Sequence, residues 1–340
     1  MSEINTSIAQ EPDPVVEPDP RLVVPEREFT VKARSQGELI RRRFFQHKLA
    51  VISMIILGLV ILLAFVGAAL WKYSYSTPMP LTNRGRPTWD LIPWLDGDGL
   101  GLGNHPFGQD QIGRDYFALT MRGAQRSLII AFVAGLLATV IGTIVGALAG
   151  FYRGWVDNVL MRFVDVALTI PLLLVAAVLG RRTQSLPILK DVFGANSIYL
   201  LALTIGLASW LSISRVVRGE FLSLREKEYV EAARALGTPN SRIIRRHLLP
   251  NAAGSIIVNA TLLVSAAILI ETALSYLGLG VRGSDWSLGK QVSEYQQAFK
   301  TRPWLFWYPG IFIIIIALTI NFIGDGLRDA FDPKQTRVRQ

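Results

Sequence analysis

Six long apolar windows dominate this sequence; five are free of charged residues and histidines, and the third contains one acidic residue, Asp165. They contain 18 to 25 residues each, and a helix needs roughly 20 residues to cross the ~30 Å hydrocarbon layer at ~1.5 Å per residue. With 51% of its residues apolar and only 18% charged, the chain is too hydrophobic for an ordinary soluble domain. The windows are 49–71, 128–152, 163–180, 192–214, 248–270 and 303–324. We therefore predict an all-α, polytopic membrane protein with six transmembrane helices.

The composition excludes chemistry based on thiols and argues against a metal site. The chain has no cysteine, which excludes disulfides and thiolate ligands. Its three histidines, His47, His105 and His247, lie far apart and lack the spacing of metal ligands. No nucleophile, base and oxyanion donor converge in the sequence. We predict a chain without catalytic residues, without a metal site and without a cofactor of its own.

The distribution of Lys and Arg predicts how the chain crosses the membrane. Six spans place both termini on one side, and the segments on that side hold 22 of the 35 basic residues. Basic residues mark the cytoplasmic side, above all next to the first span, where Arg41, Arg42 and Arg43 lie. We predict cytoplasmic termini. A nucleic-acid surface is the weaker explanation of the net charge of +9.

The segments outside the windows differ in composition. The N-terminal tail is rich in proline and acidic residues and has few large apolar ones, so it can bury little surface. In chain order we predict a disordered cytoplasmic tail (1–35), an amphipathic interfacial segment (36–48), and a six-helix transmembrane domain (49–324) with an extracytoplasmic loop (73–127) and a cytoplasmic loop (215–250), followed by a C-terminal cytoplasmic tail (325–340).

Two features predict the shape and packing of the membrane helices. Gly142, Gly146 and Gly150 recur every four residues in the second window, so they share a helix face that lets another helix approach closely. Pro171 in the third window removes a helical hydrogen bond and is expected to kink that helix.

Two acidic residues flank or enter the apolar windows: Asp165 lies inside the third, and Glu271 follows the fifth. Asp165 follows Arg162 by three residues, and we expect a local ion pair on one helix turn. Glu271 ends the fifth window and is expected near the outer interface, because a charge at the bilayer centre costs roughly 2.5–3.5 kcal/mol on insertion scales. A packing role, a position lining a gate or the transport path, and a role as an ion relay all remain open for Glu271.

The polar loop before the fifth window is long for a connection between helices, which marks it as a candidate functional element. Apolar side chains at i, i+3, i+4 and i+7 predict one stripe on a short helix. Gly237 stands where a left-handed residue would end that helix. Thr238 and Pro239 then suit the start of a second helix. The stripe consists of Tyr229, Ala232, Ala233 and Leu236. Such a hairpin either binds a partner or is merely solvated, and periodicity alone leaves both interpretations open.

This loop resembles the E-A-A-x3-G-x9-I-x-L-P signature of ABC importer permeases. The matching residues are Glu231, Ala232, Ala233, Gly237, Leu249 and Pro250. His247 stands where the general pattern has Ile, and this variant is similar to the peptide and nickel permease branch. Further segments that resemble the C-type subunit of that branch are NHPFGQDQIGRD (104–115), FYRGWVDNVLMRFVDVALTIP (151–171), ETALSYLGLG (271–280) and GDGLRDAFDPK (324–334).

The resemblance implies a type I ABC importer permease in a bacterial inner membrane. Its partners would be a second, B-type permease subunit, two cytoplasmic ATPase subunits or a fused ATPase, and an extracytoplasmic substrate-binding protein. ATP and Mg would be bound by the ATPase partners, since Gly289 and Lys290 lack the remainder of a Walker A loop. The implied ATPase-coupling residues are Glu231, Ala232, Ala233, Arg234, Ala235, Leu236, Gly237, His247, Leu249 and Pro250.

Oligopeptides or dipeptides lead among the implied cargoes, followed by nickel chelates. The main rival is a self-contained secondary transporter or channel that uses Glu271 or Asp165 as an ion relay. Such proteins often contain internal repeats, and none is evident here. Dependence of uptake on ATP or on an ion gradient separates the two classes.

Overall fold

The computed structural model describes residues 36–88, 103–183, 198–281 and 285–332 of the chain. Within these ranges it is helical and contains no strand, apart from one isolated bridge between Gln109 and Asp115. The predicted tail at 1–35 lies outside the described residues. The helices are α1 (Gln36–Gln46), α2 (Lys48–Leu62), η2 (Leu63–Gly67), α3 (Ala68–Leu70), η3 (Asn83–Gly85), α5 (Tyr116–Tyr152), α6 (Gly154–Leu168), α7 (Leu172–Thr183), α9 (Ile198–Leu224), α10 (Glu228–Ala235), α11 (Asn240–Ile243), η4 (Ile244–Leu248), α12 (Leu249–Tyr276), α13 (Leu288–Tyr295), η5 (Gln296–Lys300) and α14 (Trp304–Phe331).

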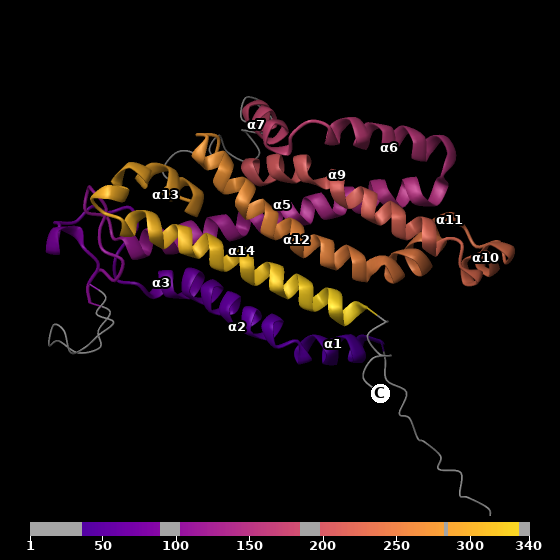
Figure 1. The fold of residues 1–340 in the computed structure, drawn as a ribbon, viewed down its shortest axis with the longest axis horizontal. Helices are drawn as coiled ribbons and strands as arrows, with labels where there is room; N and C mark the ends of the chain where they lie inside the picture. Colours follow the sequence, from indigo (N-terminus) through magenta and orange to yellow (C-terminus); the bar gives the residue numbers. More distant parts are fainter. Residues whose placement is uncertain (1–35, 89–102, 184–197, 282–284, 333–340) are drawn as a thin grey trace, which may run out of the picture.

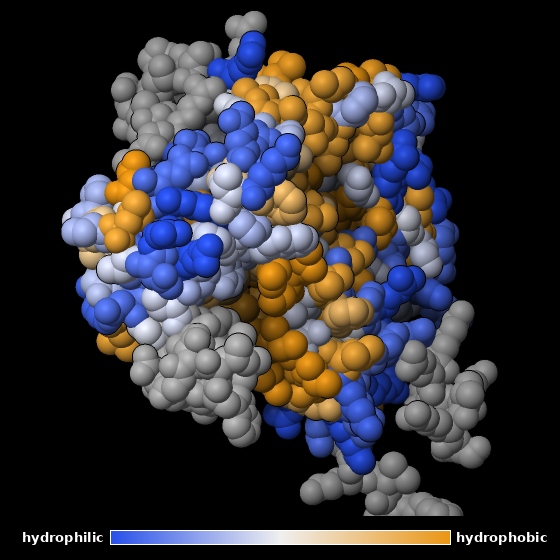
Figure 2. Space-filling model, turned by 60° about the vertical axis from the view of Figure 1, so that its left-hand side comes forward, coloured by the Kyte–Doolittle hydropathy of each residue, from blue (hydrophilic) through white to orange (hydrophobic). Residues whose placement is uncertain are grey.

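Five helical stretches of the described chain are long and apolar enough to cross a membrane, and a bent pair makes up to six. The five are Lys48–Leu70, Tyr116–Tyr152, Ile198–Leu224, Asn240–Tyr276 and Trp304–Phe331. They lie side by side as an elongated bundle (Figure 1). Figure 2 shows apolar side chains over the flanks of this bundle, while hydrophilic ones gather over the end that faces the viewer. A flank of this kind suits contact with hydrocarbon.

The third predicted span is not one continuous helix. Residues of its window belong to α6 and α7, which meet at an angle of 93°. The break falls at Pro171, whose ring and missing N–H prevent the helix from continuing. The predicted kink is therefore confirmed, and the chain turns there by about a right angle.

Several helices extend beyond the apolar windows. The helix α5 begins at Tyr116, twelve residues before its window, because the carboxylate of Asp115 accepts a hydrogen bond from the Ala118 N–H at 2.7 Å and caps it. The helices α9 and α14 also run past their windows, to Leu224 and Phe331. The predicted loop from 215 and the predicted tail from 325 are thus helical at their starts, since polar residues outside the hydrocarbon can continue a helix.

The closest helix packing is between α5 and α9, and the glycine stripe of α5 faces α9. A Cβ atom placed on Gly142 would lie 2.7 Å from the Trp210 carbonyl oxygen, and one on Gly146 would lie 2.4 Å from that of Ser214. At Gly150 the distance to the Arg218 carbonyl oxygen would be 2.7 Å. Only glycine leaves room for a backbone at this distance. The three glycines therefore allow the backbones of α5 and α9 to pack in direct contact.

The amphipathic segment is the helix α1, which lies beside the end of α14. Phe44 is buried with Ala50 and Ala330, whereas Phe45 is exposed. His47 caps α2 by accepting the Ala50 N–H at 3.2 Å through Nδ1. One face of α1 is thereby attached to the bundle, and the other is open to the interface.

At the opposite end of the bundle from α10, the irregular segment before α5 is clamped to α13 (Figure 1). The Asp110 carboxylate accepts hydrogen bonds from Arg114 Nε at 2.6 Å and from the Tyr295 hydroxyl at 2.9 Å. Burial and the nearby Asp110 carboxylate raise the pKa of Tyr295, so its hydroxyl stays protonated and donates. Arg302 adds a hydrogen bond from Nη1 to the Asp110 carbonyl oxygen at 2.9 Å.

Candidate coupling site

The loop between α9 and α12 forms the predicted helix, break and helix. The helix α10 ends at Gly237, which has φ +71°. The Gly237 N–H donates to the Arg234 carbonyl at 2.9 Å, and the Thr238 N–H donates to the Ala233 carbonyl at 3.0 Å. This is the Schellman pattern, in which a left-handed glycine closes the helix. The second helix begins at Asn240, with Pro239 in the capping position that we expected for Thr238.

The helix α10 is seated on the membrane helices by one face. Val230 is fully buried and Ala233 is 7% exposed. Both pack in an apolar cluster that also contains Phe151 from α5, Phe221 from α9 and Ile243 from α11. Movement of α10 must therefore displace the ends of several helices, because packed interiors transmit strain.

The face of α10 that is buried is not the predicted apolar stripe. Leu236 is 85% exposed and Tyr229 is 40% exposed, so neither belongs to the face that packs against the membrane helices. The buried pair is spaced i, i+3 and starts at Val230, one residue after Tyr229. Ala233 is the predicted coupling residue that faces inward, and its small side chain allows α10 to approach the bundle. The exposed residues among the predicted coupling residues of α10 and its turn are Glu231, Ala232, Arg234, Ala235, Leu236 and Gly237.

Two arginines attach α10 to the end of α5. Arg225 Nη1 donates a hydrogen bond to the Phe151 carbonyl oxygen. The guanidinium carbon of Arg234 lies 5.5 Å from the centre of the Phe151 ring, a distance suited to a cation–π contact. Burial, together with the guanidinium groups of Arg153 and Arg234, lowers the pKa of Arg225. Arg153 forms an ion pair with Glu226 at 2.6 Å, so acidic and basic groups both lie near the buried face of α10.

The second helix of the hairpin leads without a break into a membrane span. The helix α11 continues as the π-helical turn η4 and then as α12. His247 lies in that turn with its ring 6.4 Å from the ring of Tyr229. Leu249 packs against the same apolar cluster as α10, and Pro250 is exposed near the start of α12. The predicted residues His247, Leu249 and Pro250 thus lie at the joint between hairpin and span.

Glu271 is fully buried. Its carboxylate accepts hydrogen bonds from the hydroxyls of Ser275 and Ser287 at 2.7 Å and of Ser127 at 3.0 Å. The backbone of Gly289 is a further hydrogen-bond partner. These partners belong to α5, α12 and the segment around α13. Among the three interpretations left open, the geometry favours packing: the carboxylate joins three elements and its acceptors are satisfied.

Asp165 pairs across two helices, so the expected partner was wrong. Its carboxylate contacts Arg215 of α9 instead of Arg162 on its own helix. A second pair nearby joins the same helices: Arg218 binds both carboxylate oxygens of Asp157, at 2.5 and 2.6 Å. The two pairs hold α6 against α9.

No group of three or more histidine or acidic side chains suited to a metal ion occurs in the described parts of the chain. His105 bonds through Nδ1 to the Asp115 carboxylate at 2.7 Å, and both are buried. His47 lies 3.5 Å from Asp329. These histidines serve helix ends and loop packing.

The sequence motifs missed the residues that pack α10 against the membrane helices. Val230, Phe151 and Arg225 hold α10 in place, yet each looks ordinary in the sequence. The i, i+3 spacing of Val230 and Ala233 was visible, but it competes with the longer stripe through Tyr229. The contact between Arg225 and Phe151 joins positions 74 apart and carries no local signal.

Comparisons with known proteins agree with this architecture. Residues 142–337 match the family described as binding-protein-dependent transport system inner membrane component, and residues 35–87 match the N-terminal TM domain of oligopeptide transport permease C. The oligopeptide transport system permease protein of Mycobacterium tuberculosis H37Rv is 36% identical over 306 residues, which cover 90% of this chain and 97% of the relative. The protein of the same name from Escherichia coli K12 is 37% identical over 304 residues, covering 89% and 93%.

A solved structure also shares the fold. A chain of the MetNI methionine ABC transporter in an inward-facing conformation matches with a TM-score of 0.51 and 21% identity, covering 63% of this chain and 96% of that one. This likeness concerns the fold, whereas the sequence matches concern the family. The chain therefore belongs to the family of inner membrane components of binding-protein-dependent transport systems, in which it is a permease subunit.

Proposed function

We propose that this chain is one of two permease subunits of an ATP-driven peptide importer and that α10 couples it to a cytoplasmic ATPase. The observation that carries the proposal is the two-faced geometry of α10. Val230 and Ala233 bind it to the bundle, while Leu236 and its neighbours are exposed. The peptide cargo is supported by relatives at 36–37% identity that are named oligopeptide permeases.

The exposed face offers a partner a contact of mixed chemistry. Leu236 supplies apolar area, Ala232 and Ala235 let a surface approach closely, and Glu231 and Arg234 supply opposite charges. Buried apolar contacts with charged groups at the rim are typical of protein interfaces. The docked partner would be an ATPase subunit, which supplies ATP and Mg binding.

Motion of α10 would reach the membrane by two routes. One route passes through Arg225 and Phe151 to α5, which the glycine stripe ties to α9. The other passes through Ile243 and the continuous helix to α12. A displacement imposed by closing ATPase subunits would thus move three spans together and change access to the path shared with the second permease.

The proposed topology has both termini and α10 on the cytoplasmic side. The clamped segment around Asp110 and α13 then faces outward, where a substrate-binding protein delivers cargo. The basic residues of α1 support this orientation, since Arg41 and Arg42 are exposed beside the start of the first span.

Reconstitution in lipid vesicles tests the proposal. The chain, a second permease and the ATPase subunits are incorporated together, and uptake of a labelled oligopeptide from its binding protein is measured. We expect uptake with ATP, and none with an ion gradient alone or with an ATPase variant unable to hydrolyse ATP. Uptake by the chain alone, driven by an ion gradient, would overturn the proposal and favour the secondary transporter.

A further inference from the structure

A polar cavity of about 620 Å³ opens between the ends of α1, α9, α12 and α14. It does not include α10 or Glu271. Asn251, Ser255 and Asn259 of α12 line it at intervals of four residues, which places them on one helix face. Val216 of α9 and Phe331 of α14 add apolar walls, and Arg328 lies on the lining as well.

The asparagines present acceptors to this cavity. Nδ2 of Asn251 donates to the His247 carbonyl at 2.6 Å, and Nδ2 of Asn259 donates to the Ser255 carbonyl at 2.8 Å. In the part of the chain that the structure describes, neither Oδ1 atom accepts a hydrogen bond. Each amide therefore donates to a carbonyl four residues before it and keeps its own carbonyl oxygen for another group.

Glu220 of α9 is not among the residues that line the cavity, but it binds one of them. The Ser255 hydroxyl donates to Glu220 Oε1, which draws the carboxylate to the middle of the stripe. The wall therefore carries two amide oxygens and the Ser255 oxygen, whose own proton is donated to Glu220, so all three can accept hydrogen bonds. Groups that carry several N–H donors, such as a peptide backbone or an ammonium terminus, complement such a wall.

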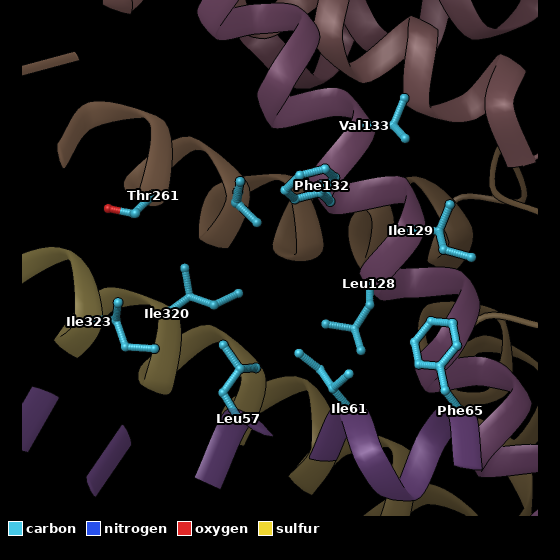
Figure 3. Close-up of a pocket in the computed structure, with 11 residues that line it drawn as sticks. Leu57, Ile61, Phe65, Leu128, Ile129, Phe132, Val133, Thr261, Ile320 and Ile323 are labelled. Carbon is cyan, nitrogen blue, oxygen red and sulfur yellow. The ribbon is translucent and has the colours of Figure 1, made fainter. Parts of the chain in front are cut away.

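A second cavity of the bundle differs from this one in having an apolar lining. Its volume is about 470 Å³, and its lining is apolar except for Thr261. Leu57 and Ile61 come from α2, Leu128 and Phe132 from α5 (Figure 3). That surface suits hydrocarbon or an apolar helix. The stripe of Asn251, Ser255 and Asn259 does not, because exposed amides and carboxylates within spans face water or protein.

The polar cavity is also connected to the coupling helix. Asn251 Nδ2 lies 3.4 Å from the hydroxyl oxygen of Tyr229, the second residue of α10. A shift of α10 would alter the first position of the stripe. The cavity volume lies within the ~300–1,000 Å³ typical of small-ligand sites.

We propose that this cavity is the cytoplasmic vestibule of the transport path, and that Asn251, Ser255 and Asn259, with Glu220 orienting the Ser255 hydroxyl, bind the N–H donors of a passing peptide. The inference rests on the proposed function and assigns residues to its path. Acceptors along one wall would hold peptides by groups that every peptide has. The vestibule would therefore recognise the backbone and leave side-chain choice to the binding protein.

Cysteine labelling tests the vestibule, because the natural chain has no cysteine and gives no background. Asn251→Cys, Ser255→Cys and Asn259→Cys are introduced singly into the reconstituted complex and exposed to a hydrophilic maleimide from the ATPase side. The matched control is Ile257→Cys, an exposed residue on the other side of the same helix.

We expect labelling at the three stripe positions, slower labelling when oligopeptide is present at high concentration, and little labelling at Ile257→Cys. Labelling of the control as fast as the stripe, or none at the stripe, would overturn the inference. ATP-driven uptake is measured in the same vesicles. Lost uptake in the unmodified complex contradicts the proposed function, whereas normal uptake with an unlabelled stripe contradicts only the vestibule.

A second variant pair tests the acceptor role. Asn259→Leu removes one acceptor, and Asn259→Asp keeps one. We expect Asn259→Leu to weaken protection by peptide at Ser255→Cys about two- to tenfold, the loss of one neutral hydrogen bond, while Asn259→Asp retains protection. Equal protection in both variants would show that the wall does not bind cargo.

Discussion

Gly237 ends α10 in a left-handed conformation, and the geometry of the exposed loop depends on it. No atom outside its own neighbourhood lies within 4 Å of a Cβ built there, so space is available and only the backbone angle is restrictive. The motif spacing alone identified this residue, because a positive φ after a short helix has a strong local signature.

Gly237→Val tests that turn. A side chain in the left-handed region costs roughly 1–2 kcal/mol, which lowers the population of the turn about 5- to 30-fold. We expect the assembled complex to hydrolyse more ATP for each peptide imported. Gly219→Val is the matched control, since Gly219 of α9 also has open space but an ordinary φ. Equal coupling ratios in both variants would contradict the assigned role of the turn.

Ala232 and Ala233 are adjacent in the sequence but serve different surfaces. Ala232 is exposed, whereas Ala233 is buried beside Phe221 and Val230. We expect Ala233→Asp to unseat α10, because a carboxylate would enter an apolar cluster; limited proteolysis of the loop should become faster. Ala232→Asp should leave proteolysis unchanged and weaken binding of the ATPase. Equal resistance to proteolysis in both variants would contradict the packing of Ala233 against the membrane helices.

Glu271 offers a third test at this scale. Glu271→Ala would leave the hydroxyls of Ser127, Ser275 and Ser287 without their acceptor, at about 1–3 kcal/mol for each unsatisfied group. We expect a clear fall in the Tm of the purified protein in detergent, and a smaller fall for Glu271→Gln. An unchanged Tm with abolished uptake would instead favour the ion relay.

At the scale of elements, the sequence predicts the spans better than their ends. Hydrophobic windows indicate which parts of the chain can lie in the hydrocarbon, and five of the six correspond to unbroken helical stretches. Pro171 predicted the kink but not its 93° angle. Nothing in the sequence indicated that Asp157 and Asp165 pair with α9, because these contacts join distant segments. Caps such as Asp115 set helix ends outside the windows, where hydropathy carries no information.

Gly146→Leu tests the junction of α5 and α9. Even a Cβ atom at this position would lie 2.4 Å from the Ser214 carbonyl oxygen and 2.8 Å from Val217 Cβ. Overpacking of this kind costs about 1–3 kcal/mol, so we expect a lower Tm and reduced amounts of folded protein. Gly58→Leu on α2 is the control, because open space surrounds it. A similar Tm for both variants would contradict close packing at the glycine stripe.

For the whole molecule, the family and the helix, break and helix of the loop around α10 could be predicted, whereas the proposed transport surface could not. The loop motif is local and its residues are contiguous, so one chain displays it. The stripe of Asn251, Ser255 and Asn259 has helical spacing too, but similar polar residues occur at many membrane helix ends. The role proposed for the stripe rests on its contact with Glu220 and on the cavity that it lines with α9 and α14. The sequence pattern does not show that these segments lie together.

Crosslinking at Leu236 tests most directly whether α10 is the coupling element. Leu236→Cys places one thiol on the outward face, and Leu59→Cys places one on the exposed flank of α2 as control. In the assembled complex we expect a short bifunctional reagent to join Leu236→Cys, but not Leu59→Cys, to an ATPase subunit and to stop peptide uptake. Full ATP-driven uptake with no crosslink at Leu236→Cys would contradict the account.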